Sequence, residues 1–158
     1  MFLAALILIL STALFFFYFQ ATCQKILRRQ FDREYFQAIV NANRLEFPSV
    51  RKALEEFDEP VDYPRLRMML KCDFLALTYL LKNAANLQQR YSGEERLLMI
   101  YFRFVFLSML TRHLLRLREK SAILKLTVIL QYFANVLGQR VNTIRLADLS
   151  ASDYLLKL

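Results

Sequence analysis

The residue types that carry most enzyme chemistry are few and scattered in this sequence. It holds one histidine, His113, and two cysteines, Cys23 and Cys72, which lie far apart. So small a set cannot assemble a tetrahedral metal site from histidine and cysteine. Two isolated cysteines without a metal or redox motif are instead typical of free thiols in a reducing compartment.

His113 stands in the basic segment TRHLLRLREK. A phosphorylated or haem-ligating histidine is one interpretation of this position. A phosphoacceptor histidine is usually followed by an acidic residue, whereas Leu114 and Leu115 follow here. A structural or solvated histidine is therefore the favoured interpretation, and its protonated form would favour a helix C-terminus. No metal and no cofactor are predicted.

Acidic residues form one cluster, at Glu55, Glu56, Asp58, Glu59 and Asp62. Neighbouring carboxylates are able to bind a divalent ion or to act as acid and base. The spacing and the glycine of an EF-hand loop are missing. The favoured interpretation is a solvated loop that faces a partner protein, with Glu55, Glu56 and Glu59 as candidate contact residues.

Loops that hold phosphate groups need glycine, and this chain has only two glycines. They cannot make a dinucleotide fingerprint, and the sequence contains no G-x-x-x-x-G-K-[ST] loop. A Ser-His-Asp signature is missing as well. We therefore predict that the protein is not an enzyme.

Basic residues outnumber acidic ones by 22 to 14, for a net charge of +8. One stretch gathers five of them: Arg112, Arg116, Arg118, Lys120 and Lys125. Nucleic acid is one possible partner for such a stretch. Anionic lipid headgroups are the favoured partner, because each basic residue near a membrane surface is attracted by about 1 kcal/mol.

The element that positions these residues is an apolar helix at the start of the sequence. Residues 2–19 are apolar except Ser11 and Thr12, whose hydroxyls can bond to the helix backbone. Through Cys23 such a helix rises roughly 33 Å, about the thickness of a bilayer's hydrocarbon core. A basic region before the apolar run and an A-x-A site after it, both expected of a signal peptide, are absent. We expect residues 1–23 to be a retained transmembrane anchor.

Flanking charge predicts the orientation of this single span. The basic residues Lys25, Arg28, Arg29 and Arg33 follow it, which places the N-terminus outside by the positive-inside rule. Residues 24–158 then form a cytoplasmic-side domain, at a bacterial inner membrane or an organelle equivalent. An aromatic run suits the headgroup belt and completes the predicted anchoring set: Phe15, Phe16, Phe17, Tyr18 and Phe19.

The domain after the span is predicted to be all-α, a bundle of about four to five helices. Helix formers dominate and turn residues are scarce, since the chain has three prolines beside its two glycines. We expect the first helix to run unbroken from residue 2 to about 42. Further helices are expected at 49–57, 64–90, 94–118 and 122–137, the last of these ended by Gly138, with a short one from Ser150.

Two of these segments carry apolar residues at alternating spacings of four and three, which is typical of a bundle seam. The seams are Leu70, Phe74, Leu77, Leu81 and Ala84 in one segment, and Ile123, Leu126, Leu130, Phe133 and Leu137 in the other. They are expected to close one bundle within the chain, although pairing between two copies is an alternative.

The helix predicted at 94–118 is apolar on nearly every face, in the stretch LLMIYFRFVFLSML. A core helix is the favoured interpretation, ahead of contact with a partner or the membrane surface. A second span is disfavoured, because the segment is short and Arg103 stands near its centre. Candidate partner contacts here are Tyr101, Phe102, Arg103 and Phe106.

These features favour a non-catalytic accessory or scaffold subunit of a larger membrane protein complex. One span offers no transport path, and an apolar fraction of 56% with a mean hydropathy of +0.26 leaves apolar surface for a partner to cover. The alternative is a membrane-tethered helical module that recruits a soluble partner or an anionic ligand. Such a module would release its ligand as salt rises.

Replacing Arg28, Arg29 and Arg33 together by Glu should weaken or invert membrane insertion, because the change removes the positive charge that sets orientation. Protease protection of the C-terminal domain in membrane vesicles measures the outcome. An unchanged protection pattern would contradict the predicted orientation.

Overall fold

The computed structural model describes residues 2–31, 34–56, 62–83, 91–115, 117 and 119–155, with side chains up to Thr143. This part of the chain forms six α-helices and no strand, which confirms the all-α prediction. The helices are α1 (Phe2–Leu27), α2 (Phe36–Asn43), α3 (Phe47–Glu56), α4 (Tyr63–Asn83), α5 (Gly93–Leu114) and α6 (Lys120–Leu155). Six residues singled out above lie outside the described part: Arg33, Asp58, Glu59, Ala84, Arg116 and Arg118.

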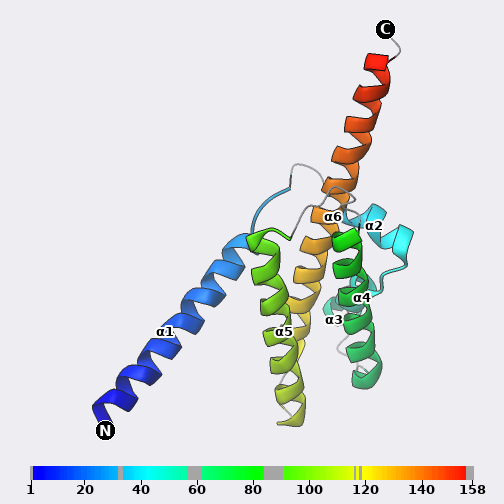
Figure 1. The fold of residues 1–158 in the computed structure, drawn as a ribbon. Helices are drawn as coiled ribbons and strands as arrows, with labels where there is room; N and C mark the ends of the chain where they lie inside the picture. The colour runs from blue at the N-terminus through cyan, green and yellow to red at the C-terminus, as the bar shows by residue number, and fades with distance from the viewer. Residues whose placement is uncertain are drawn as a thin grey trace.

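Helix α6 runs through the centre of the molecule, with α4 and α5 beside it and the short helices α2 and α3 against it (Figure 1). Its C-terminal part extends beyond the other helices. Helix α1 meets the bundle only near its own C-terminal end, and its N-terminal half diverges from α5. Three helices in the described part are long and apolar enough to cross a membrane, namely α1, α5 and Lys120–Thr143 of α6.

The two predicted seams meet in the core of this bundle. Leu70, Leu77 and Leu81 of α4 are fully buried, as are Leu126 and Leu130 of α6. The rings of Phe74 and Phe102 stack with centroids 4.0 Å apart and join α4 to α5. Because both seams are buried within one chain, they are not available for pairing between copies.

The prediction of one helix from residue 2 to 42 is wrong, since α1 ends at Leu27 and α2 begins at Phe36. The break turns α2 onto α6. There Asn135 Oδ1 accepts hydrogen bonds from the backbone N–H groups of Tyr35 and Phe36, both at 2.9 Å. These N–H groups have no partner within their own short helix, so a side chain 100 residues away caps it.

The prediction that Gly138 ends a helix is also wrong, as is a separate helix from Ser150, because α6 continues through both to Leu155. Gly138 instead allows α2 and α6 to approach each other closely. A Cβ added at Gly138 would collide with the Cβ of Tyr35 and crowd the Cγ of the same residue. A glycine inside a helix costs up to about 1 kcal/mol relative to alanine, and contact between α2 and α6 explains why one stands here.

The capping box predicted before the fifth helix is confirmed. Ser92 Oγ accepts from the Glu95 N–H at 3.2 Å, and the Glu95 carboxylate accepts from the Ser92 N–H at 3.1 Å. A second cap, which local sequence does not reveal, belongs to α3. Asp73 of α4 accepts from the backbone N–H groups of Glu46 and Phe47, at 3.0 and 2.8 Å.

Replacing Gly138 by Ala should destabilise the protein by about 1–3 kcal/mol, despite the higher helix propensity of alanine, because the new methyl group forces α2 away from α6. Gly93 provides the matched control, since a Cβ there meets nothing within 4 Å. Gly93→Ala should be neutral or stabilising by up to about 1 kcal/mol. Thermal melts of the full-length variants in mild detergent, followed by circular dichroism, measure both. Equal melting temperatures would contradict the close approach.

The buried carboxyl group of Asp73 should make the free energy of unfolding depend on pH. Burial raises its pKa above the ordinary 3.8 and outweighs the two backbone hydrogen bonds, which act to lower it. The native state then binds more protons than the unfolded state between 3.8 and the raised value, so the free energy of unfolding falls as pH rises through that window.

Asp73→Asn should remove this slope and keep an acceptor for the cap. Asp73→Ala should lose about 1–2 kcal/mol, because two N–H groups lose their partner. Melting temperatures of both variants and of the unchanged protein, measured across the acidic range, test the assignment. An equal loss in Asn and Ala variants would show that the cap contributes nothing.

Candidate functional site

Of the residues first considered for chemistry, His113 packs between helices, Cys23 is buried and Cys72 is exposed. The described residues hold no group of three or more metal-ligating side chains. His113, near the end of α5, stacks on Tyr63 of α4 with ring centroids 3.5 Å apart. Its Nδ1 lies 2.7 Å from a carboxylate oxygen of Glu119, just before α6. His113 therefore links the ends of three helices.

Tyr63 completes this contact. Burial raises the pKa of its hydroxyl, and the neighbouring Glu119 raises it further, so the phenol stays protonated at neutral pH. The three side chains form a packed, polar corner where α4, α5 and α6 meet. Sequence reasoning favoured a structural or solvated His113 but did not find its partner, because Tyr63 lies 50 residues away in the sequence.

Of the acidic cluster, Glu55 and Glu56 lie on α3, whereas Asp62 lies just before α4 and is exposed. Glu55 pairs with Arg51 at 2.9 Å and Glu56 with Lys52 at 3.9 Å, one turn apart on α3. Both carboxylates are about half exposed. Exposed pairs of this kind add about 0.5 kcal/mol or less to helix stability.

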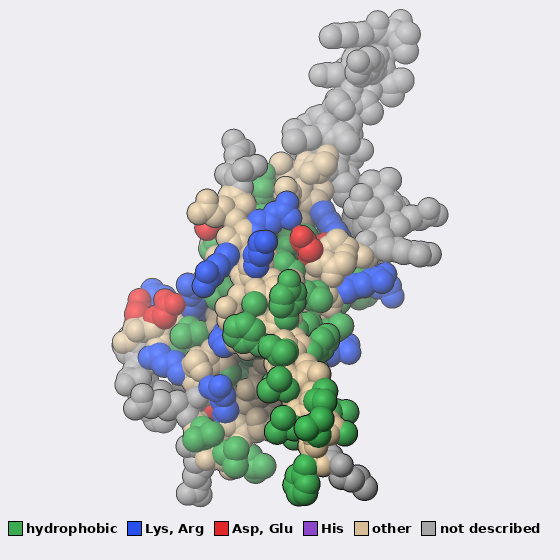
Figure 2. All heavy atoms as spheres, turned by 90° about the vertical axis from the view of Figure 1, so that its left-hand side faces the viewer, with side chains coloured by type: hydrophobic (Ala, Val, Ile, Leu, Met, Phe, Trp, Pro, Cys, Tyr) green, Lys and Arg blue, Asp and Glu red, His purple; other side chains and the backbone are tan. Residues whose placement is uncertain are grey.

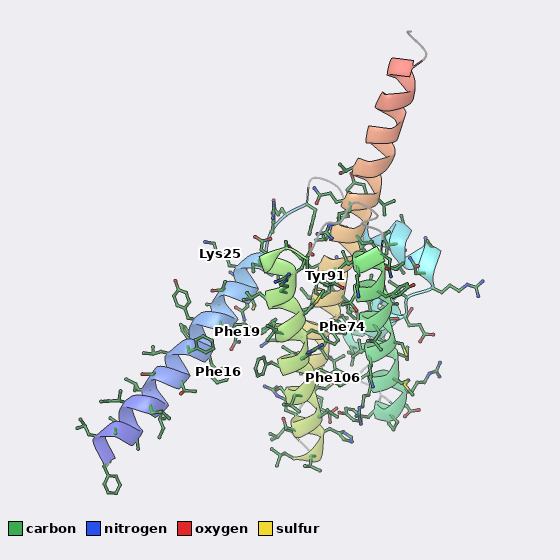
Figure 3. All side chains as sticks on the ribbon, viewed as in Figure 1. Phe16, Phe19, Lys25, Phe74, Tyr91 and Phe106 are labelled. Atoms are coloured by element: carbon green, nitrogen blue, oxygen red, sulfur yellow. The ribbon has the colours of Figure 1, made fainter. Side chains whose placement is uncertain are left out.

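The aromatic run of α1 divides into two groups. Phe15, Phe17 and Tyr18 are exposed to 67, 73 and 77%, and face away from the bundle. Phe16 and Phe19 lie in the space between α1 and α5 (Figure 3), each with its ring about 6 Å from Phe104. The contact between α1 and the bundle is thus an edge-to-face aromatic cluster, a preferred geometry for such rings.

Lys25 follows this cluster on the same helix, points away from the bundle and is exposed. Arg28 and Arg29 lie at the helix end and are exposed as well. The described members of the basic group therefore lie together, past the aromatic run and beside the start of α5. Thr12 and Thr22 each donate a hydrogen bond to the carbonyl one turn back, so the hydroxyl of Thr12 is satisfied within α1 as expected.

Helix α5 buries one face only. Tyr101 and Phe102 are 5 and 3% exposed, and they pack toward α1 and α4 respectively. Phe106 is half-buried and Arg103 is exposed. On the outer face, Ile100, Phe104 and Leu107 are 48, 47 and 56% exposed. Of the four residues that the sequence singled out on this helix, Arg103 is the exposed one, and the exposed apolar side chains beside it are these three.

Together, Ile100, Phe104 and Leu107 of α5 and the exposed apolar side chains of α1 form what we call the apolar face. The α1 members that are large and exposed are Phe2, Leu3, Leu6, Ile7, Leu8, Ile9, Leu10, Leu14, Phe15, Phe16, Phe17 and Tyr18. Hydrophobic side chains gather in the lower part of this side of the molecule, with basic side chains above and beside them (Figure 2). Monomeric soluble proteins rarely expose so large an apolar surface.

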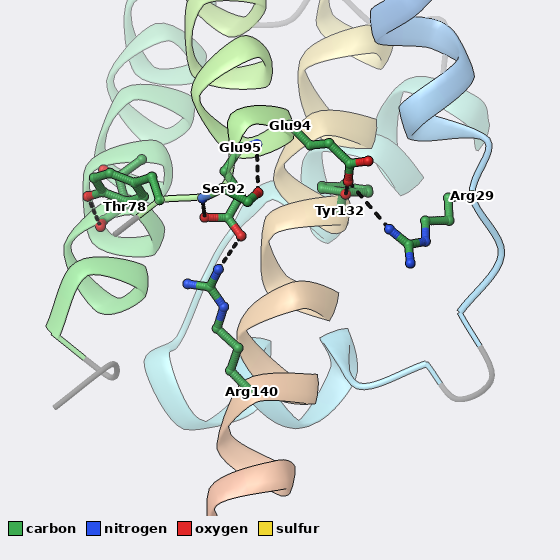
Figure 4. A network of polar contacts seen from close by, with 8 residues as sticks. Arg29, Thr78, Ser92, Glu94, Glu95, Tyr132 and Arg140 are labelled. Carbon is green, nitrogen blue, oxygen red and sulfur yellow. Dashed lines mark hydrogen bonds and ion pairs between the residues drawn. The ribbon is translucent and has the colours of Figure 1, made fainter. Parts of the chain in front are cut away.

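A polar network fixes the opposite end of the bundle (Figure 4). The buried carboxylate of Glu95 accepts from Arg140 of α6 as well as capping α5. Glu94 reaches both Arg29 and the hydroxyl of Tyr132, each at 3.4 Å. The network joins the chain after α1 to α5 and α6, so the polar and apolar ends of the head are held apart.

No protein-family model matches the chain. The searches of curated proteins and of solved structures return no match either. The function therefore has to be argued from the apolar face and the charges around it.

Proposed function

We propose that the protein is a non-catalytic, single-pass accessory or scaffold subunit of a larger membrane protein complex. It docks through α1 and through the outer face of α5. The observation that carries the proposal is the exposure of the apolar face: Leu8, Phe15 and Phe17 are 69, 67 and 73% exposed. Side chains of this size favour an apolar environment by about 1.5–3 kcal/mol each, so this surface needs lipid or protein against it.

Among the three helices able to cross a membrane, α1 is the one we assign as the span. Its most apolar window has none of its residues buried within the chain, compared with 67% of the α6 window. A helix buried by its own neighbours is a core helix. The α5 window is 28% buried and holds Arg103, whose charge would cost about 2.5–3.5 kcal/mol at the centre of a bilayer.

The orientation we propose follows the charge at the head end of α1. Lys25, Arg28 and Arg29 are exposed and lie on the side of the span where the bundle begins. Basic residues at that boundary favour the cytoplasmic side, with the N-terminus across the membrane. The partner surfaces are then a membrane helix of another subunit, packed along α1, and a separate protein surface against the outer face of α5.

Purification through a C-terminal tag in gentle detergent, with a high-salt wash and mass spectrometry of the eluate, tests the proposal. A constant set of membrane proteins in fixed ratio is expected. A protein that elutes alone would overturn the subunit assignment. Companions lost to salt would favour the recruitment module, since contacts held by charge weaken as ions screen them.

Ile100→Gln combined with Leu107→Gln should reduce the amount of co-purified partner at least tenfold, because each change removes apolar contact worth about 1 kcal/mol or more. The matched control is Met68→Gln with Tyr79→Gln on α4, where both side chains are 64 and 67% exposed. The control should retain its partners. Equal recovery from both variants would show that α5 is not a docking surface.

A further inference from the structure

An apolar groove lies between α4 and α5. It has a volume of about 420 Å³ and is lined by six large apolar side chains and two cations, Lys71 and Arg103. Phe74 of α4 and Phe106 of α5 line it from opposite walls (Figure 3). Binding sites for small molecules measure about 300–1,000 Å³ and combine an apolar lining with a few polar groups. The groove therefore has the size and the lining of a ligand site.

The two cations lie at nearly the same level of the groove. Helices α4 and α5 run antiparallel, and Phe74 stacks on Phe102 across them. Lys71 lies three residues before Phe74, which is the direction in which α5 continues past Phe102. Arg103 lies one residue past Phe102, so the two cations differ by only about 3 Å along the groove. One cation thus stands on each wall, where both are able to reach the same ligand group.

The charges of this pair are available to a ligand. Lys71 and Arg103 are exposed, and within the described part of the chain neither makes an ion pair or a side-chain hydrogen bond. No carboxylate is among the described residues that line the groove. The buried carboxylate of Asp73 faces α3, where it accepts two backbone hydrogen bonds. A guanidinium binds a carboxylate through two parallel hydrogen bonds, and a lysine beside it adds a second charge.

The apolar part of the groove continues from the cations in one direction. Phe106, Leu107 and Leu110 follow Arg103 along α5 over seven residues, or about 10 Å of helix. Phe106 and Leu110 are half-buried, and Leu107 is 56% exposed. A ligand held by an anionic group at the two cations would therefore lay an apolar chain along these three side chains.

The width of the groove favours an extended chain over a helix of a partner protein. The stacked rings of Phe74 and Phe102 hold α4 and α5 in direct contact. The axes of helices in such contact lie about 8–10 Å apart, whereas an α-helix with its side chains is about 10–12 Å across. A partner helix would cover the groove without entering it, and a single hydrocarbon chain is able to lie inside.

We propose that the groove binds a long-chain fatty acid, with its carboxylate between Lys71 and Arg103 and its hydrocarbon chain along Phe106, Leu107 and Leu110. The site lies within the bundle, so it does not depend on which helix crosses the membrane. Leu107 also belongs to the apolar face. A bound fatty acid would therefore contribute to the surface that a partner protein meets.

The test uses fluorescence, because the chain contains no tryptophan and a single introduced one reports on its own surroundings. Leu107→Trp places the reporter at the groove, and Tyr79→Trp places it on the exposed surface of α4 outside the groove. The full-length variants in detergent are titrated with dibromostearic acid, whose bromine atoms quench tryptophan on contact. Quenching of Leu107→Trp should saturate, with a midpoint at least tenfold below that of Tyr79→Trp.

The charge requirement is tested in the Leu107→Trp protein. Lys71→Gln with Arg103→Gln should raise the midpoint at least tenfold, because the carboxylate loses both cations. Arg67→Gln with Lys82→Gln removes the same charge from exposed residues of α4 outside the groove, and should leave the midpoint unchanged. The methyl ester of the acid, which carries no charge, should bind as weakly to the unchanged groove as the acid binds to the Lys71/Arg103 variant. Circular dichroism verifies that each variant is folded.

Three results would overturn the inference: equal quenching of the two reporters, a midpoint that the Lys71/Arg103 change leaves unaltered, or equally tight binding of the methyl ester. A phospholipid with the same brominated chain that quenches Leu107→Trp at a lower concentration than the acid would overturn it as well. Absence of quenching at the groove, together with loss of co-purified proteins from the Lys71/Arg103 variant, would assign the groove to an acidic segment of a partner protein instead.

Discussion

The structure depends on the contact between α2 and α6. Helix α6 packs against each of the other helices, so its position determines theirs. Gly138 allows the backbone to approach Tyr35, and one turn earlier Asn135 caps α2 through two hydrogen bonds. The contact therefore needs both the glycine at position 138 and the buried side-chain amide of Asn135. It turns the chain after α1, and this turn separates the apolar helix from the bundle.

Because α1 diverges from the bundle, most of its apolar side chains are exposed. A helix that continued along the bundle would bury its apolar residues against α5 and α6. Here the contact with the bundle involves the aromatic cluster of Phe16 and Phe19 and the last turns of α1, where Cys23 is buried, whereas the described residues before Phe15 are exposed. The polar network of Glu94, Glu95 and Arg140 fixes the other end. One end of the molecule is therefore suited to water and one side to an apolar environment.

Whether the sequence predicts a feature of this structure depends on how far apart in the sequence the interacting residues lie. Helix class, the two seams and the capping box at Ser92 follow from residues within two turns of each other, and all are confirmed. The break after Leu27, the continuation of α6 through Gly138 and the caps from Asp73 and Asn135 depend on residues 26 or more positions apart. A glycine read locally predicts a helix end, and only the partner across the contact shows that it serves packing. The same limit applies to His113, because its stacking partner Tyr63 lies 50 residues away in the sequence.

The charges around the apolar face constrain what can cover it. A soluble partner would bury the exposed side chains of α5 but leave the far turns of α1 in water, where a surface of that size is unfavourable. A bilayer alone would cover α1 but leave the exposed apolar side chains on the outer face of α5 without a partner. The proposed function places lipid along the N-terminal half of α1 and a protein surface against the outer face of α5, which together would cover the exposed apolar side chains of both helices.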